Sequence, residues 1–264
     1  MTGQCRMTHE GYDVGVTANA FSWGTATDVG RVRARNEDAF LVDEQIGLFG
    51  VVDGMGGHPG GDVAAGTIAE AFPNEVSRKF TTMRTRQARA IRRWLESLVV
   101  QQSLQLCFQG LSRPGYAGMG ATLAVLLGIG GRAYMANLGD SRIYCLRTQR
   151  LSQLSRDHSV IAELLDAGEI RPQDVATHGA RGLLTQYVGM PEEPKPYVRS
   201  RVLHAGDRFL LCTDGLTNMV SEPAIARILG LHAEPRQAAE ALVEAANDAG
   251  GMDNTTVVVA DWQR

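Results

Sequence analysis

Eight short runs of strand-like composition constrain the fold of this 264-residue chain more than any other feature. Gly, Asp or Ser turns join several of them, and such short connections favour antiparallel pairing. The runs occupy residues 20–26, 46–53, 121–129, 132–140, 142–147, 197–203, 208–214 and 255–261. Residues 121–147 predict three meandering strands, with turns at Gly130-Gly131 and Gly139-Asp140-Ser141.

Five segments have helical spacing, at residues 62–72, 86–109, 159–168, 221–230 and 235–251. Asp62 is the expected N-cap of the first, with Pro73 near its end, and Ser221 is the expected cap of the fourth. Gly168 is the expected stop of the third. Helices beside runs of strands indicate an α+β fold rather than a doubly wound one. We expect one domain over residues 19–264, preceded by a flexible tail at 1–18.

Composition excludes several classes of function. An apolar fraction of 44% supports a real core, and the formal net charge of −3 gives no case for nucleic acid or an anionic membrane as partner. The seven Lys and Arg residues within 78–93 read best as a solvated helix face, with nucleic-acid binding the weaker alternative. The four cysteines form no CxxC pair, and no run of 18 apolar residues occurs, so we expect a soluble cytoplasmic protein with free thiols.

Residues 48–66, "LFGVVDGMGGHPGGDVAAG", contain seven glycines directly around and after an apolar run that ends at Asp53. Asp-Gly after a strand is often only a hairpin turn. This loop is longer than such a turn, and a glycine cluster usually means that the backbone must approach something closely. The alternative is therefore a ligand or metal site at the end of the strand.

Acidic residues recur at strand ends and starts. Asp53, Asp140 and Asp214 end three of the apolar runs, Asp253 precedes the last run, and Glu37-Asp38 stands at the entry to a further strand. If these carboxylates converge, protonation or a cation must relieve their repulsion. Carboxylates without Cys or paired His suit Mg²⁺ or Mn²⁺ in octahedral oxygen coordination.

The ordered set "RVRARNEDAF", "VVDGMGGHPGGDVAAG", "GATLAV", "ANLGDSRIY", "RDHS", "LLCTDGL" and "GGMDNTTVVVAD" resembles the metal-dependent serine/threonine protein phosphatases of the type-2C (PPM) family, bacterial branch. The resemblance covers about residues 22–262. It implies a four-layer α-β-β-α sandwich with two central antiparallel sheets and a metal cleft at one end.

The resemblance also implies roles for matching residues. Asp53 would bridge two metal ions, Mn²⁺ or Mg²⁺, and the Gly54 carbonyl would bind one of them, with Glu37 reaching it through water. Asp214 and Asp253 would hold the other ion, and Asp140 with Asp214 would form a weaker third site. Asp38 and Asn254 would support these ligands, and Arg33 would bind the substrate phosphate.

The reaction implied is hydrolysis of phosphoserine and phosphothreonine. Two divalent ions about 4 Å apart can share a water and yield a hydroxide nucleophile near neutral pH. The expected setting is a monomer that acts on phosphorylated proteins and opposes a bacterial Ser/Thr kinase.

The sequence departs from part of the family at Met55, where many eukaryotic members carry a His proposed as general acid. His58 could substitute through water, although a loop histidine with a local hydrogen bond is more common. His158 is expected to be structural, and residues 165–195 match the variable flap of the family. The competing functions are a catalytically silent module that binds a phosphorylated partner, and a nucleotide-binding protein, which the absence of GxxxxGK[ST] disfavours.

Overall fold

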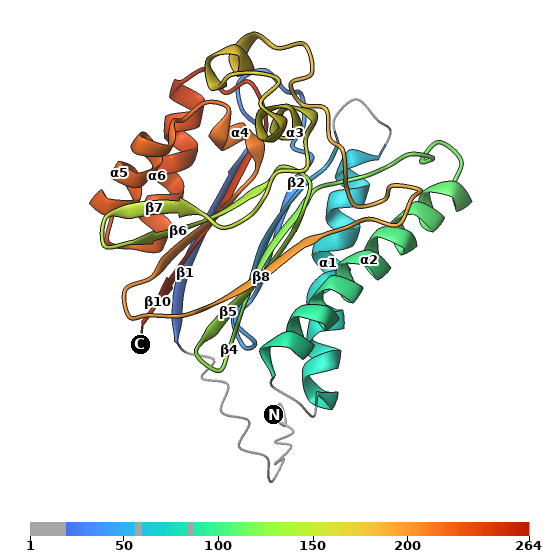
Figure 1. Cartoon of the computed structure of the whole chain (residues 1–264), viewed down its shortest axis with the longest axis horizontal. Coiled ribbons are helices and arrows are strands. Elements are labelled where there is room, and N and C mark those ends of the chain that lie inside the picture. The colour runs from blue at the N-terminus through green and yellow to red at the C-terminus, as the bar shows by residue number, and fades with distance from the viewer. Residues whose placement is uncertain (1–19, 56–59, 84–86, 264) are drawn as a thin grey trace, which may run out of the picture.

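Two five-stranded antiparallel sheets face each other in this computed structural model, which describes residues 20–55, 60–83 and 87–263. Helices cover the outer face of each sheet (Figure 1). The predicted α+β sandwich is thereby confirmed. The predicted tail at 1–18 lies outside the described residues.

Sheet A contains the first and the last of the described strands. Its strand order is β1-β10-β9-β6-β7, so the first and last strands are neighbours. The strands are β1 (Phe21–Asp28), β10 (Thr255–Trp262), β9 (Arg208–Cys212), β6 (Arg142–Arg147) and β7 (Arg150–Gln153).

Sheet B has the order β2-β3-β4-β5-β8. Its strands are β2 (Asp38–Asp43), β3 (Leu48–Asp53), β4 (Leu123–Ile129), β5 (Arg132–Leu138) and β8 (Tyr197–Val202). Both faces of its inner strands are covered, which explains why β3 and β4 read as continuous apolar runs rather than alternating ones.

The helices fall into two outer groups. Beside sheet B lie α1 (Gly61–Thr82) and α2 (Ala88–Ser112), and beside sheet A lie α5 (Glu222–Leu231) and α6 (Pro235–Asp248) (Figure 1). Short α3 (Val160–Ala167), the 3₁₀ helix η1 (Pro172–Thr177) and α4 (Asp214–Thr217) lie near the end of the sandwich where β3, β5 and β9 finish. Among the described helices, none is long and apolar enough to cross a membrane.

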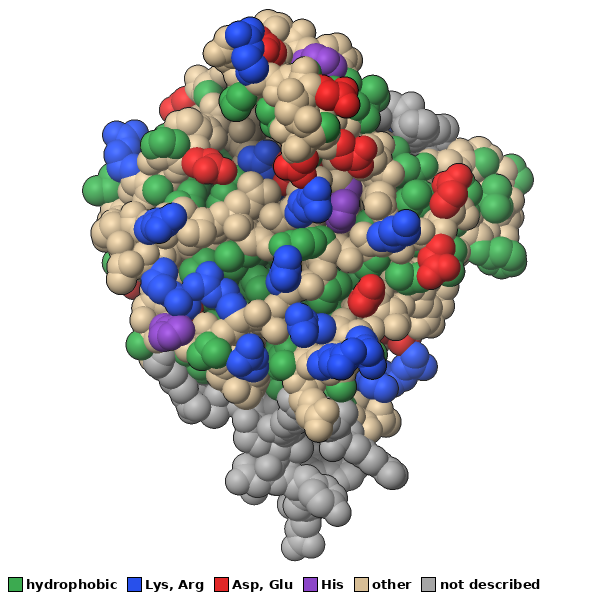
Figure 2. Space-filling model, in the orientation of Figure 1, with side chains coloured by type: hydrophobic (Ala, Val, Ile, Leu, Met, Phe, Trp, Pro, Cys, Tyr) green, Lys and Arg blue, Asp and Glu red, His purple; other side chains and the backbone are tan. Residues whose placement is uncertain are grey.

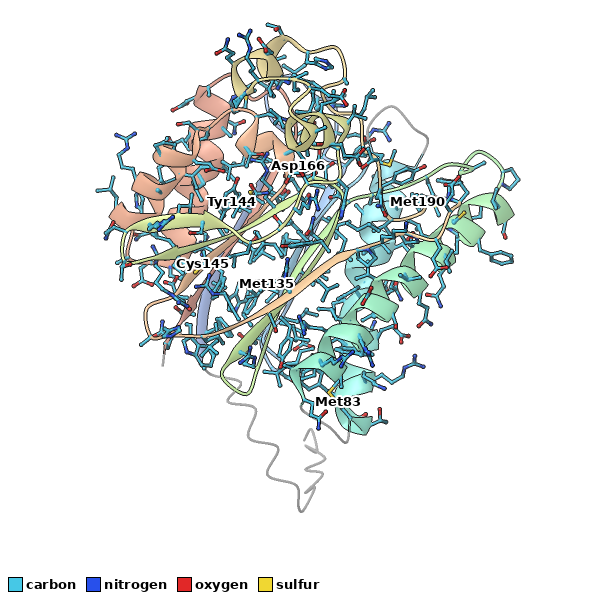
Figure 3. All side chains as sticks on the ribbon, in the orientation of Figure 1. Met83, Met135, Tyr144, Cys145, Asp166 and Met190 are labelled. Atoms are coloured by element: carbon cyan, nitrogen blue, oxygen red, sulfur yellow. The ribbon has the colours of Figure 1, made fainter. Side chains whose placement is uncertain are left out.

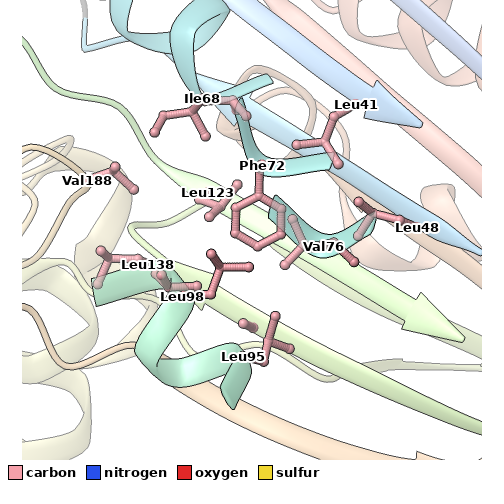
Figure 4. Close-up of a cluster of buried hydrophobic side chains, with 14 of the residues drawn as sticks. Leu41, Leu48, Ile68, Phe72, Val76, Leu95, Leu98, Leu123, Leu138 and Val188 are labelled. Carbon is pink, nitrogen blue, oxygen red and sulfur yellow. The ribbon is translucent and has the colours of Figure 1, made fainter. Parts of the chain in front are cut away.

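Three apolar layers hold these parts together. Phe72 and Val76 of α1 pack with Leu95 of α2 against sheet B (Figure 4). Side chains such as Met135 of β5 and Cys145 of β6 fill the space between the sheets (Figure 3). The third layer lies between sheet A and α5 and α6.

The predicted meander of three strands is wrong in its last member. Strands β4 and β5 pair, but β6 pairs with β7 and β9 in sheet A. The turn at Gly139, with φ +105°, therefore carries the chain from one sheet to the other. Strand β7 and helix α4 were not predicted, because both are only four residues long.

The first helix also differs from the prediction. It continues through Pro73 to Thr82, because the buried Phe72 and Val76 stabilise it by more than the lost backbone bond costs. Its N-cap is Gly60, with φ 87°, rather than Asp62. Asp62 lies in the first turn, where the positive end of the helix favours a carboxylate.

The other helix ends agree more closely with the sequence. Gly168 ends α3 in the left-handed conformation, as predicted. Ser221 occupies the N-cap of α5, but its side chain makes no capping hydrogen bond. Helix α6 ends at Asp248, before the predicted limit of 251.

Candidate active site

The acidic residues singled out in the sequence come from both sheets and meet at one end of the sandwich. Asp53 is the last residue of β3, and Asp140 follows β5 by one residue, both in sheet B. Asp214 follows β9 and Asp253 precedes β10, both in sheet A. A cleft of about 370 Å³ is lined by Asp140, Asp214 and Asp253.

Asp53 is held by backbone contacts to β4 and by its partner strand β2. Its N–H donates to Thr122 Oγ1 at 3.1 Å, and its carbonyl accepts from Thr122 N at 2.8 Å. Asp38 is its direct cross-strand neighbour. Burial first, and then the charges of Asp38 and Asp214, raise the pKa of Asp53 well above its usual value.

Asp38 lies at the seam between the sheets. Its Oδ2 accepts from the Thr213 hydroxyl at 2.9 Å, across to sheet A, whereas its Oδ1 is buried without a hydrogen-bond partner among the described residues. Burial raises the pKa of Asp38 to about 7, with Asp214 and Asp253 adding to the effect against the hydrogen bond from Thr213. A buried carboxylate oxygen without a partner indicates that a bound group belongs beside it.

The pKa values of Asp214 and Asp140 are raised, as are those of Asp53 and Asp38. Asn218 Nδ2 donates to Asp214 Oδ2 at 2.9 Å, one turn along α4. Burial and the charge of Asp253 raise the pKa of Asp214. Burial, Asp214 and Asp157 raise the pKa of Asp140 to about 8, although Arg142 opposes them.

Arg33 lies beside Asp253 rather than at a distance from the carboxylates. Its Nη2 donates to Asp253 Oδ2 at 2.7 Å, and its side chain remains 42% exposed. Its guanidinium also feels the charges of Asp53 and Glu37. An exposed, planar cation at the rim of a carboxylate cluster is suited to a second anion such as a phosphate.

Asn254 ties the loop before β2 to the start of β10. Its Oδ1 accepts from the Glu37 N–H at 2.8 Å. Its Nδ2 donates to the carbonyls of Val29 and Arg35, each at 2.9 Å. This amide fixes the position of the segment that carries both Arg33 and Glu37.

Gly54 shows why the sequence accepts so many glycines after Asp53. Its N–H donates to the Glu37 carbonyl at 3.1 Å. A Cβ on Gly54 would lie 2.3 Å from the Gly61 carbonyl oxygen and 2.5 Å from that of Glu37. The main chain of β2, the end of β3 and the start of α1 therefore approach one another at a distance that only glycine permits.

These residues fit hard divalent cations better than any other group. The donors are carboxylates and a backbone carbonyl, and the raised pKa values show charges that need neutralisation. In the described part of the chain, no three Asp, Glu, His or Cys side chains converge tightly enough to hold an ion alone. Mg²⁺ and Mn²⁺ tolerate such a site, since they keep several water ligands.

The candidate proton donors are less well supported. His58 lies outside the described residues. Nδ1 of His158 accepts from the Gly139 N–H at 3.2 Å, and burial lowers its pKa, so it stabilises the turn before Asp140. Thr122, Thr213 and Asn218 were missed in the sequence, because a single hydroxyl or amide beside an apolar run gives no signal of its partner.

Oxygen ligands that converge at the common end of two stacked antiparallel sheets are suited to metal-assisted hydrolysis. The chain matches the family description "Protein phosphatase 2C" over residues 30–247. It is 34% identical to the protein phosphatase PhpP of Streptococcus pneumoniae over 88% of this chain and 94% of that protein. This chain belongs to the protein phosphatase 2C family.

Solved structures agree with this assignment. The crystal structure of the Mycobacterium tuberculosis serine/threonine phosphatase PstP/Ppp is similar with a TM-score of 0.81 and 33% identity, covering 92% of this chain and 99% of that one. The catalytic domain of PstP in complex with two manganese ions is similar with a TM-score of 0.79 and 32% identity, over 92% and 99% of the two chains.

Proposed function

We propose that this protein is a metal-dependent phosphatase that hydrolyses phosphoserine and phosphothreonine in proteins. The observation that carries the proposal is the convergence of Asp53, Asp214 and Asp253 with Arg33 at one end of a type-2C sandwich. The relatives named above are protein phosphatases, which supports phosphoprotein as the substrate class.

The metal ligands follow from the donors on both sheets. Asp53, at the centre of the acidic cluster, is the residue that two ions would share, with the Gly54 carbonyl on one side. Asp214 and Asp253 would hold the ion on the sheet A side, and Glu37 would act through water. When bound, the cations supply a nucleophile by lowering the pKa of water, and they neutralise phosphoryl oxygens. The two manganese ions in PstP support Mn²⁺, and Mg²⁺ suits the same donors.

Three further residues complete the proposed site. Asp140, near Asp214, would take part in a weaker third site. Asp38 and Asn254 hold the ligand-bearing segments in place through their contacts to Thr213 and Glu37. Substitution of Asp38 or Asn254 should lower activity by displacing the proposed metal ligands.

Arg33 would bind the substrate phosphate through two parallel N–H donors. It pairs with Asp253, and this pair keeps the guanidinium at the rim of the cleft. Binding of phosphate to Arg33 and of a cation to Asp253 would each replace one half of that pair. When the phosphate and the cation are both bound, Arg33 and Asp253 therefore each still have a partner of opposite charge.

The biological setting follows by analogy with the family. We expect a monomer that removes phosphate placed on proteins by a cognate Ser/Thr kinase. This part rests on the type of relative rather than on any feature of the cleft.

The test is hydrolysis of a phosphothreonine peptide with EDTA, Mg²⁺ or Mn²⁺. Asp53→Ala and Asp214→Ala should each abolish metal-dependent turnover, whereas Glu244→Gln, on the exposed side of α6, should retain it. A folded, metal-loaded wild type that is inert on several phosphopeptides would contradict the proposal. A silent module that binds a phosphorylated partner would then be the better reading.

A further inference from the structure

A cluster of polar side chains comes from α2 and from the face of sheet B that α2 covers, far from the acidic cleft. It comprises Arg92 of α2, Arg132 and Tyr134 of β5, and Ser200 of β8. We call these four residues the β5 cluster. We propose that the β5 cluster is a second phosphate-binding site of this protein.

Strand register places three of the residues together. Arg132 and Tyr134 are two apart on β5, so they project from the same face of the sheet. Tyr134 is directly opposite Ser200 of β8 in the antiparallel pair, and such pairs share a face. That face carries α2, because Tyr134 packs in the apolar layer between sheet B and the helices.

Helix α2, which carries Arg92, packs against β5 and β8. The guanidinium charges of both Arg92 and Arg132 act on the Tyr134 hydroxyl and lower its pKa, although burial raises it more. Two cations and two hydroxyls thus come from three elements of the fold. Figure 2 shows Lys and Arg side chains gathered over the lower half of the molecular surface in view, with most Asp and Glu above them.

Two donors of the β5 cluster are unsatisfied. The Nε atoms of Arg92 and Arg132 are both buried without a hydrogen-bond partner in the described part of the chain. Tyr134, whose hydroxyl is the third donor, is only 1% exposed. Buried donors without partners point to a bound ion or water.

The two arginines also lack acidic partners. All nine ion pairs among the described residues use an arginine, and neither Arg92 nor Arg132 belongs to any of them. Glu96, one turn along α2 from Arg92, is the nearest acidic residue in sequence and does not pair with it. Two arginines with two hydroxyls suit a tetrahedral oxyanion, because the guanidinium fork bonds two oxygens at once.

The β5 cluster is separate from the catalytic cleft. Arg132 and Leu138 are the two ends of β5, which spans roughly 20 Å at strand spacing. Asp140 lies beyond the Leu138 end. The ligand could be the inorganic phosphate that a phosphatase releases or a phosphorylated side chain of a protein, and both present the same group.

Equilibrium titration with inorganic phosphate tests the site. The protein is treated with EDTA and kept at fixed ionic strength, so that phosphate binding through metal ions in the catalytic cleft does not contribute to the titration. We expect saturable binding to wild type, weakened about tenfold or more by Arg132→Gln or Arg92→Gln, since each removes a charge-assisted bond. Arg227→Gln, which removes an exposed arginine of α5, should bind as wild type does.

A second arm separates the two sources of phosphate. A phosphoserine peptide is titrated beside its unphosphorylated form, and inorganic phosphate is added as competitor. Peptide binding that phosphate displaces identifies a docked phosphoprotein, and binding of free phosphate alone identifies the product.

Three results would overturn the proposal. They are the absence of saturable binding of either probe, equal binding by chloride, and unchanged binding in both arginine variants. Circular dichroism checks that each variant is folded. Turnover of a phosphopeptide is measured in parallel with Mn²⁺. A failure of phosphate binding at the β5 cluster can then be told apart from a failure of the proposed catalytic function.

Discussion

Without metal, the protein should lose stability as the pH rises from about 6.5 to about 8. The structural cause is Asp140, because burial and the charge of Asp214 raise the pKa of this carboxyl group from 3.8 to about 8. The unfolded chain has this carboxyl ionised throughout that range, whereas the folded protein retains its proton. Folding therefore binds a proton, and the free energy of unfolding falls by about 1.4 kcal/mol per pH unit.

Over the 1.5 pH units this amounts to about 2 kcal/mol from Asp140 at most, because the carboxylate is only half-buried. Asp38, with a pKa of about 7, contributes in the same direction over the lower part of the range. The range lies above most of the effect of His158, whose lowered pKa acts in the opposite direction at more acidic pH.

Urea denaturation in EDTA at the two pH values measures the effect. Asp140→Asn should remove about 2 kcal/mol of the pH dependence, whereas Asp248→Asn, at the exposed end of α6, should leave it unchanged. Excess Mn²⁺ should reduce the dependence in wild type, because cation binding replaces protonation. Wild-type stability that is flat or rises between the two pH values in EDTA would refute this reasoning, as would an equal slope in Asp140→Asn.

Three further outcomes are expected. Gly54→Ala should abolish metal-dependent turnover and destabilise the fold by about 1–3 kcal/mol in denaturant, since its Cβ would lie 2.3 Å from the Gly61 carbonyl; a fully active variant would contradict the close approach. Arg33→Ala should lower kcat/KM for a phosphopeptide roughly tenfold to a hundredfold, with partial recovery in Arg33→Lys, and unchanged kinetics would exclude a role in phosphate binding. Phe72→Ala should cost about 3–5 kcal/mol of unfolding free energy, and a loss below about 1 kcal/mol would show that the layer against sheet B refills the cavity.

Local sequence patterns predicted most of the strands but not how they divide between sheets. The run that became β6 has an apolar centre, as β4 and β5 do, and nothing in its residues distinguishes a third meander strand from a crossing to the other sheet. The positive φ of Gly139 makes that crossing, and only tertiary packing selects it. Pro73 shows the same limit, because its local preference to end a helix was overridden by burial of its neighbours.

The acidic residues of the candidate site were predictable because each stands where an apolar run stops or begins. Their convergence followed from the resemblance to a family, not from spacing. Asn254 was predicted as a supporting residue, but Thr122, Thr213 and Asn218 could not be, since the Thr213 hydroxyl, for example, reaches Asp38 across 175 positions of sequence. The β5 cluster was hidden for the same reason, because register and helix packing bring its members together.

The pairing of β1 with β10 affects the order in which the two sheets can form during synthesis. Strand β1 leaves the ribosome before the other described strands, yet its only neighbour in sheet A is β10, the last of the described strands to be made. Sheet B, apart from β8, is synthesised within the first 138 residues and can begin to form while sheet A still lacks both β9 and β10. Asp53 is thus synthesised long before Asp214 and Asp253, so a nascent or C-terminally truncated chain would carry the sheet B part of the acidic cluster without the two proposed metal ligands of sheet A.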